Sequence, residues 1–161
     1  MTTRENLQGN LDTELIDRID RQIEIEASAE KVWDLVSRPG WWINEQEVDP
    51  NPVLRQEGDD LHVLVHEKYG EFRLQTLDAD RPRYVAFRWI DNVAPDSGTT
   101  VEFWIDEHDG GVTLRVAETG FASLRKDRAA IENQVRENTH GWEMELEAAR
   151  RFVTATPDGA A

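Results

Sequence analysis

Residues 127–153 carry the longest amphipathic pattern of the chain and predict a single helix. Apolar positions recur every three, four or seven residues, which places them on one face at about 100° per residue. Asn138 interrupts this face, and Gly141 precedes a large indole. A glycine inside a helix costs about 1 kcal/mol relative to alanine, so we expect it to admit another backbone or a bound molecule. The apolar face comprises Ile131, Val135, Trp142, Leu146, Ala149 and Val153.

Alternation of apolar and polar residues predicts a series of β-strands before this helix. The first half-buried strand is expected over residues 18–27. Turn-forming residues such as Asp109-Gly110-Gly111 separate the later segments by short connections, which imply antiparallel neighbours. The later strands are predicted at residues 53–56, 61–68, 71–79, 84–90, 99–106 and 112–119.

Two short helices are expected between the first strand and the second. Ser28 is a suitable N-cap for a helix whose first turn contains Glu30, and Pro39-Gly40 should end it. Trp41-Trp42-Ile43 then adds an apolar patch at the root of an acidic loop over residues 45–52.

Period-two alternation indicates which strand residues face the covered side of the sheet. The opposite side would carry Arg73, Arg88, Glu102 and Arg115, with Trp104 among them. An exposed tryptophan beside arginines predicts either a cation–π contact or a contact between two copies of the chain. The covered side would carry Phe72, Leu74, Val85, Phe87, Trp89, Val101, Phe103, Ile105, Val112, Leu114 and Val116.

This order of elements predicts one α+β domain over residues 18–153, in which a curved antiparallel sheet wraps around the long C-terminal helix. Such a concavity, lined by aromatic side chains, is a common kind of small-molecule site. Core packing explains each aromatic residue on its own, so we expect most to be core and Trp42, Trp89 and Trp142 to reach a cavity. Asn138 could bond a ligand, or equally a buried strand carbonyl or a water. The candidate ligand-binding residues are Trp42, Phe72, Phe87, Trp89, Phe103, Phe121, Asn138, Trp142 and Leu146.

Several short motifs occur in an order and spacing that together are fairly specific for one fold. They are residues 25–33 (IEASAEKVW), Trp41-Trp42, residues 84–89 (YVAFRW), residues 110–116 (GGVTLRV) with Gly120-Phe121, and Gly141-Trp142. In these motifs the chain resembles the helix-grip proteins of the START and birch-pollen-allergen-like (SRPBCC) superfamily, and most of all the domain related to the activator of the heat-shock-protein-90 ATPase. The resemblance implies a helix-grip fold. The superfamily contains lipid carriers, hormone receptors, cyclases, oxygenase subunits and co-chaperone domains, so it implies no single chemistry.

Composition narrows the range of partners and compartments. The 161 residues include 18 basic and 33 acidic side chains, and the net charge of -15 repels nucleic acid and anionic lipid surfaces. The absence of cysteine excludes disulfides, thiolate catalysis and zinc fingers. The sequence has no apolar run typical of a signal peptide or membrane span, so a cytoplasmic protein is expected. Residues 1–17 are expected to form a mobile extension and residues 154–161 a disordered tail.

Signatures of catalysis are sparse. His62 and His66 lie four residues apart, but along a strand this separation is about 13 Å, too far for both to bind one metal ion directly. The sequence shows no nucleophile elbow, phosphate loop or dinucleotide fingerprint, so no metal or organic cofactor is expected. Tyr69, His66 and Glu145 are weak candidates for an acid/base set, and Glu145 is more simply explained as a surface carboxylate.

The sequence is compatible with three functions. The first is binding of a small apolar or aromatic ligand between the sheet and the long helix. The second is a co-chaperone-type interaction module, whose acidic residues Glu45, Glu47 and Asp49 would meet basic patches of a chaperone or another protein partner. The third is a cyclase- or dehydratase-like enzyme that uses the acid/base candidates. A homodimer through the strand that carries Trp104 is a further expectation.

Overall fold

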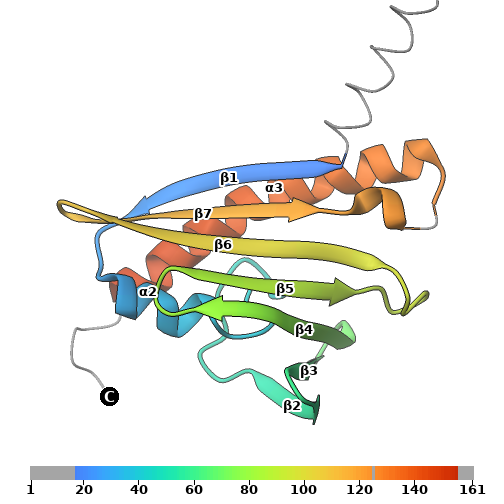
Figure 1. Cartoon of the computed structure of the whole chain (residues 1–161), viewed down its shortest axis with the longest axis horizontal. Helices are drawn as coiled ribbons and strands as arrows, with labels where there is room; N and C mark the ends of the chain where they lie inside the picture. Colours follow the sequence, from blue (N-terminus) through green and yellow to red (C-terminus); the bar gives the residue numbers. More distant parts are fainter. Residues whose placement is uncertain (1–16, 125, 156–161) are drawn as a thin grey trace, which may run out of the picture.

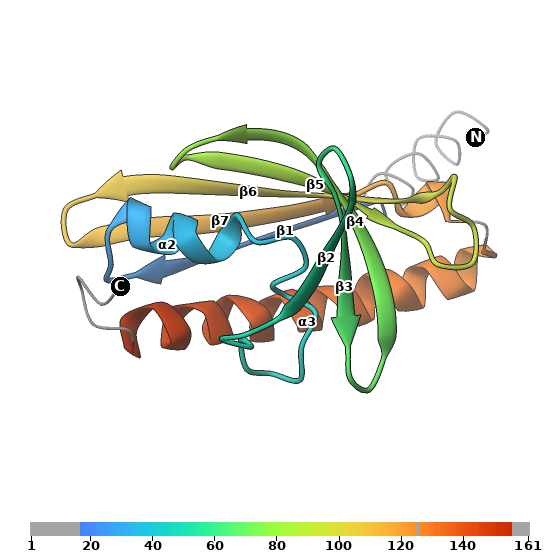
Figure 2. The same cartoon turned by 90° about the horizontal axis from the view of Figure 1, so that it is seen from below.

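The computed structural model describes residues 17–124 and 126–155, in which one antiparallel sheet curves around a long helix (Figure 1). The sheet has seven strands in the order β1-β7-β6-β5-β4-β3-β2. Helices α2 and α3 lie on the same side of this sheet (Figure 2). The strands are β1 Arg18–Ile25, β2 Val53–Gly58, β3 Leu61–His66, β4 Gly70–Asp80, β5 Tyr84–Ile90, β6 Gly98–His108 and β7 Gly111–Thr119. The helices are α2 Ala29–Val36, the short 3-10 helix η1 Phe121–Ser123 and α3 Arg128–Ala155.

The predicted α+β helix-grip architecture is confirmed, with small shifts at the ends of elements. Helix α3 extends through Ala155, so residues 154 and 155 belong to the helix and not to the expected tail. Residues 156–161 of that tail and residues 1–16 of the expected extension lie outside the described residues. Between residues 37 and 52, all of which are described, the second short helix is absent because residues 39–42 form turns.

The segment from α2 into the following turn places two tryptophans under the sheet. Ser28 Oγ accepts a hydrogen bond from the Lys31 backbone N–H at 3.2 Å and so caps α2 as predicted. Gly40 has a φ of 76°, and a Cβ atom there would lie 2.8 Å from Leu74 Cδ1. A left-handed backbone this close to another side chain requires glycine. The turn therefore directs the next two residues, both tryptophans, into the core.

The core lies between the concave face of the sheet and the second half of α3. Phe72 and Trp89 are half-buried, and Ile131 and Val135 of α3 are also half-buried. The helix therefore packs closely along its second half and less closely along its first. Fully buried members of the two predicted faces are Leu74, Val85, Phe87, Val101, Phe103, Ile105, Val112, Leu114, Val116, Trp142, Leu146, Ala149 and Val153.

Trp104 lies on the outer face of β6 against an arginine. The Arg115 guanidinium carbon is 4.5 Å from the Trp104 ring centroid, so the predicted cation–π contact is confirmed. Arg115 also pairs with Asp20 at 2.7 Å and lowers the pKa of that carboxyl, through a hydrogen bond above all. The homodimer through this strand stays a prediction.

Candidate ligand-binding site

Trp42 lies at the centre of an aromatic cluster that fills the space between the sheet and α3. Its ring centroid is 5.5 Å from that of Phe87, and 5.6 Å from those of Phe103 and Trp142. Rings at these separations are in direct contact. These four side chains and Leu146 are at most 5% exposed. All five are therefore core residues, and the hollow expected beside Trp42 and Trp142 is filled by their own rings.

A cavity of about 270 Å³ remains beyond this cluster, next to the first half of α3. Four predicted ligand-binding residues line it, namely Phe72, Trp89, Phe121 and Asn138. They come from β4, β5, η1 and α3, so the curvature of the sheet brings them together. We call this space the Glu118 cavity; its other lining residues are Ile90, Asp91, Asn92, Thr99, Glu118, Leu124, Lys126 and Gln134.

Glu118 lines the cavity although it is only 1% exposed, and it is not among the predicted site residues. A signal for it exists in the sequence. Val112, Leu114 and Val116 alternate toward the covered face of β7, and the same period of two places residue 118 on that face. An acidic residue in such a position needs partners, because an unpaired buried charge is costly.

Three donors from the sheet and the helix converge on the Glu118 carboxylate. Thr99 Oγ1 donates to Oε2 at 2.6 Å, Trp142 Nε1 donates to Oε1 at 2.8 Å, and Asn138 Nδ2 donates to Oε1 at 3.1 Å. Burial raises the pKa of Glu118, and the three donors oppose that rise. A hydroxyl can accept as well as donate, so the short contact with Thr99 accommodates the carboxyl with or without a proton.

A chain of hydrogen bonds connects this buried carboxylate with the surface. Gln134 Nε2 donates to Asn138 Oδ1 at 2.8 Å, and Lys126 Nζ donates to Gln134 Oε1 at 3.2 Å. Asn138 therefore bonds a buried side-chain carboxylate of β7, a partner that was not considered from the sequence. Its amide holds α3 and β7 together beside the cavity.

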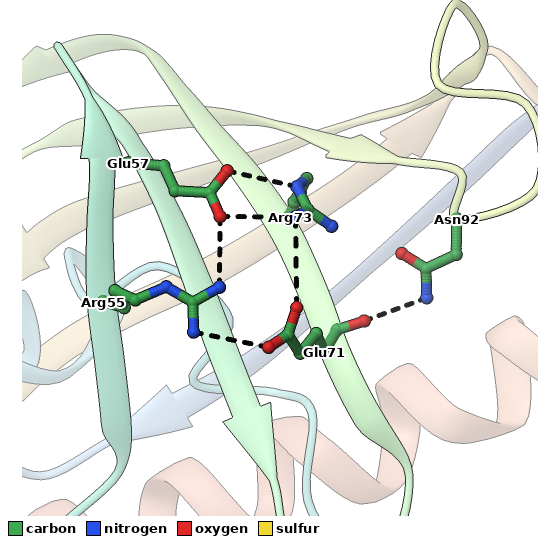
Figure 3. A network of polar contacts seen from close by, with 5 residues as sticks. All are labelled: Arg55, Glu57, Glu71, Arg73 and Asn92. Atoms are coloured by element: carbon green, nitrogen blue, oxygen red, sulfur yellow. Dashed lines mark hydrogen bonds and ion pairs between the residues drawn. The ribbon is translucent and has the colours of Figure 1, made fainter.

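The loop between β5 and β6 contributes to the cavity lining and is tied to β4. Asn92 Nδ2 donates to the backbone oxygen of Glu71 at 3.0 Å (Figure 3). The Glu71 side chain belongs to an ion-pair network, in which it meets Arg55 at 3.3 Å and Arg73 meets Glu57 at 3.2 Å. Exposed ion pairs contribute little singly. Joined in a network, they hold the part of β4 to which Asn92 is bonded.

A second pocket, of about 560 Å³, lies where α3 meets the loop after α2 and the turn between β3 and β4. Tyr69 and Glu145 line it, and the His66 ring stacks on Tyr69 with centroids 4.7 Å apart. The three acid/base candidates therefore come to one region of the fold, and the enzyme hypothesis stays a prediction. We call this space the Glu145 pocket; its lining residues are Asn44, Glu45, Gln46, Lys68, Tyr69, Gly141, Met144 and Glu145.

Neither site offers a set of metal ligands. Within residues 17–124 and 126–155, no group of three or more histidine, aspartate or glutamate side chains is placed to hold a metal ion. His62 and His66 both lie on strand β3, as predicted. No helix in this part of the chain is both long and apolar enough to cross a bilayer.

Solved structures of low sequence identity share this fold. A crystal structure of a protein from Mesorhizobium loti matches with a TM-score of 0.63 and 16% identity, over 87% of this chain and 98% of that one. A solution structure of a protein from Bacillus halodurans matches with a TM-score of 0.59 and 21% identity, over 85% and 99% of the two chains. The solution structure of the Aha1 dimer from Colwellia psychrerythraea matches with a TM-score of 0.61 and 15% identity, over 84% and 95%.

Comparison of the sequence with protein families identifies the family of this chain. No curated protein matches the chain significantly. The family model described as Activator of Hsp90 ATPase homolog 1-like protein matches residues 26–151, from just after β1 through most of α3. The resemblance inferred from the motifs is thereby confirmed, and the chain belongs to the Activator of Hsp90 ATPase homolog 1-like family.

Proposed function

We propose that this chain binds a small, mainly apolar molecule in the Glu118 cavity, with a polar group of the ligand directed toward Asn138. The observation that carries the proposal is a buried carboxylate, held by three donors, that lines a cavity with aromatic walls. Ligand pockets typically combine apolar walls with a few fixed polar groups. Membership of the family supports a ligand-binding or activator-like domain.

The dimensions and lining of the cavity restrict the ligand. Its volume of about 270 Å³ lies just below the range of roughly 300–1,000 Å³ that is typical of small-molecule sites. A molecule of one or two fused rings fits such a space. Phe72 and Trp89 offer ring surfaces for its apolar part. Asn138 Nδ2 carries a second hydrogen besides the one directed at Glu118, and a ligand hydroxyl or carbonyl oxygen can accept it.

Binding of bicyclic probes tests this proposal. We would titrate the protein with 2-naphthol, 2-acetylnaphthalene and 1-indanone, and follow binding by tryptophan fluorescence and by native mass spectrometry. Trp89→Leu removes a cavity wall and should weaken binding at least about tenfold, equivalent to about 1.4 kcal/mol. Trp104→Phe is the matched control, because it removes an indole on the outer face and should leave the affinity unchanged. Equal affinities for the two variants, or no binding of any probe, would overturn the proposal.

A second candidate function is binding to a protein partner, and the family match favours it. The family takes its description from an activator of the Hsp90 ATPase, and the net charge of -15 would steer the chain toward basic surfaces. Glu47 and Asp49 are exposed on the loop before β2. Reversing both charges to lysine should reduce capture of a chaperone from native lysate. Unchanged capture, or no chaperone in the wild-type eluate, would argue against this role.

A further inference from the structure

The face of α3 around Gly141 borders open space. Apart from its two chain neighbours and the nearby backbone of its own helix, a Cβ atom at Gly141 would meet none of the described residues within 4 Å. The expectation that this glycine admits another backbone is therefore wrong. Gly141 and Glu145 are one helical turn apart, and both line the Glu145 pocket. A glycine that costs the helix about 1 kcal/mol thus leaves the pocket open next to a carboxyl group.

Two buried oxygen atoms in this pocket accept no close hydrogen bond from the described residues, although the Asn44 side chain lies near enough to Glu145 to lower the pKa of its carboxyl. They are Glu145 Oε1 and Asn44 Oδ1, and neither has a partner among the described residues. The Asn44 amide nitrogen donates to the Trp41 backbone oxygen at 3.1 Å, which assigns the other end of the amide as the free acceptor. A buried acceptor without a donor costs about 1–3 kcal/mol. When Glu145 is ionised, the two atoms together therefore call for a molecule that carries N–H or O–H groups.

Among the residues that the structure describes, none of the charged groups around the pocket is a close counter-ion of Glu145. Glu45 is already neutralised, because Lys68 Nζ lies 2.9 Å from its carboxylate and the Tyr69 hydroxyl donates to it at 3.1 Å. The imidazole ring of His66 stacks on the phenol ring of Tyr69. Arg151 acts on Glu145 through space, while its own Nη2 donates to the Gln46 backbone oxygen at 3.1 Å. Glu145 is thus the carboxylate of this pocket that remains for a ligand.

We propose that the Glu145 pocket binds a small organic cation, a primary amine with an apolar body, whose ammonium group donates to the Glu145 carboxylate and the Asn44 side-chain oxygen. An ammonium group supplies the donors that both oxygens lack and the positive charge that a half-buried carboxylate lacks. The space above Gly141 and beside Met144 accepts the apolar body. The net charge of -15 raises the local concentration of cations. This site is separate from the Glu118 cavity and does not depend on its function.

A proton and the ammonium group compete for the same position. Burial raises the pKa of Glu145 to about 7, against the opposing effects of Asn44 and Arg151. At lower pH the protonated carboxyl can donate to Asn44 and satisfy both oxygens without a ligand. Above the pKa the carboxylate needs the cation. Amine affinity should therefore rise on the order of tenfold between pH 6 and pH 8, and then level off.

Calorimetric titration with benzylamine tests the proposal, with benzyl alcohol as the uncharged analogue of the same shape. We expect benzylamine to bind at millimolar concentration or better, benzyl alcohol to bind at least tenfold more weakly, and the affinity for benzylamine to increase with pH. Glu145→Gln should abolish the pH dependence and most of the affinity. Gly141→Leu should block the pocket while leaving a good helix-forming residue. Glu137→Gln, on the exposed surface of the same helix, is the matched control and should bind like the wild type.

Three results would overturn this proposal: equal binding of the amine and the alcohol, unchanged affinity in Glu145→Gln, or no heat of binding with wild-type protein. Circular dichroism of each variant separates a blocked pocket from a misfolded chain. Trp89→Leu should leave benzylamine binding intact, and Glu145→Gln should leave 2-naphthol binding intact. Failure of one site is therefore distinguishable from failure of the other.

Discussion

Replacing Glu145 by glutamine should stabilise the protein at pH 8 and leave its stability nearly unchanged at pH 5. Burial raises the pKa of Glu145 from its usual 4.5 to about 7. Between these two values the folded state binds more protons than the unfolded state, so the contribution of this group to stability falls as the pH rises. It is fully present below about pH 4.5 and lost above about pH 7. Glutamine stays neutral throughout and removes this dependence.

The pKa change sets the expected magnitude. At about 1.4 kcal/mol per pH unit, the full change corresponds to about 3 kcal/mol. Part of the half-buried carboxyl remains hydrated, so we expect about 2 kcal/mol between pH 5 and pH 8. With a urea slope of about 2 kcal/mol per molar, this difference moves the unfolding midpoint of Glu145→Gln up by about 1 M at pH 8.

Urea unfolding followed by tryptophan fluorescence measures the difference at each pH. Carboxylates with a lowered pKa, such as Asp20, have the opposite pH dependence but are present in both proteins, so their effect cancels. Glu137→Gln is again the control and should shift the midpoint at neither pH. Parallel curves of stability against pH for the wild type and Glu145→Gln would refute the reasoning, because burial would then not govern the protonation of this group.

Three further substitutions test the packing of the core. Trp142→Phe removes part of a buried ring and the indole N–H that donates to Glu118. It should lower the free energy of unfolding in urea by about 2–3 kcal/mol. A decrease below about 0.5 kcal/mol would show that this hydrogen bond does not anchor the helix. In Gly40→Ala the new Cβ atom would sit on a backbone of positive φ and lie 2.8 Å from Leu74. In Gly110→Ala the backbone also has a positive φ, but beyond the chain neighbours no described residue lies within 4 Å of the new Cβ atom. We expect the free energy of unfolding to fall by about 3 kcal/mol in Gly40→Ala and by about 1 kcal/mol in Gly110→Ala. Equal urea midpoints for the two variants would contradict the role of the close contact with Leu74.

Periodicity predicted the elements of this fold because both periods are set by the backbone itself. The inward positions of Phe87 and Phe103 follow from alternation along a strand, and that of Leu146 from the helical repeat. Periodicity specifies a face and not the distance to the facing element. Whether Trp42 lines a cavity or fills it depends on that distance, which the turn at Gly40 sets.

The two carboxyl groups differ in how well the sequence reveals them. Glu118 continues the inward alternation of β7, so its burial could be predicted from its position, although its partners on α3 could not. Glu145 lies at the edge of the apolar face of α3, where the helical repeat does not predict whether a side chain is buried or exposed. Its burial depends on the loop that carries Asn44 and Gln46, and an irregular loop has no repeating pattern from which its path can be predicted.

The pairing of β1 with β7 makes the order of synthesis matter for this chain. Arg18 lies opposite Thr119 and Ile25 opposite Val112, so β1 lacks its partner strand until residues 111–119 have been made. The helix that covers the apolar concave face is made later still. A nascent chain therefore exposes the apolar face of an incomplete sheet until β7 and α3 have been made. Strand pairing between residues this far apart in the sequence is slow to form. Growing chains of this protein should be clients of ribosome-associated folding factors until α3 has emerged.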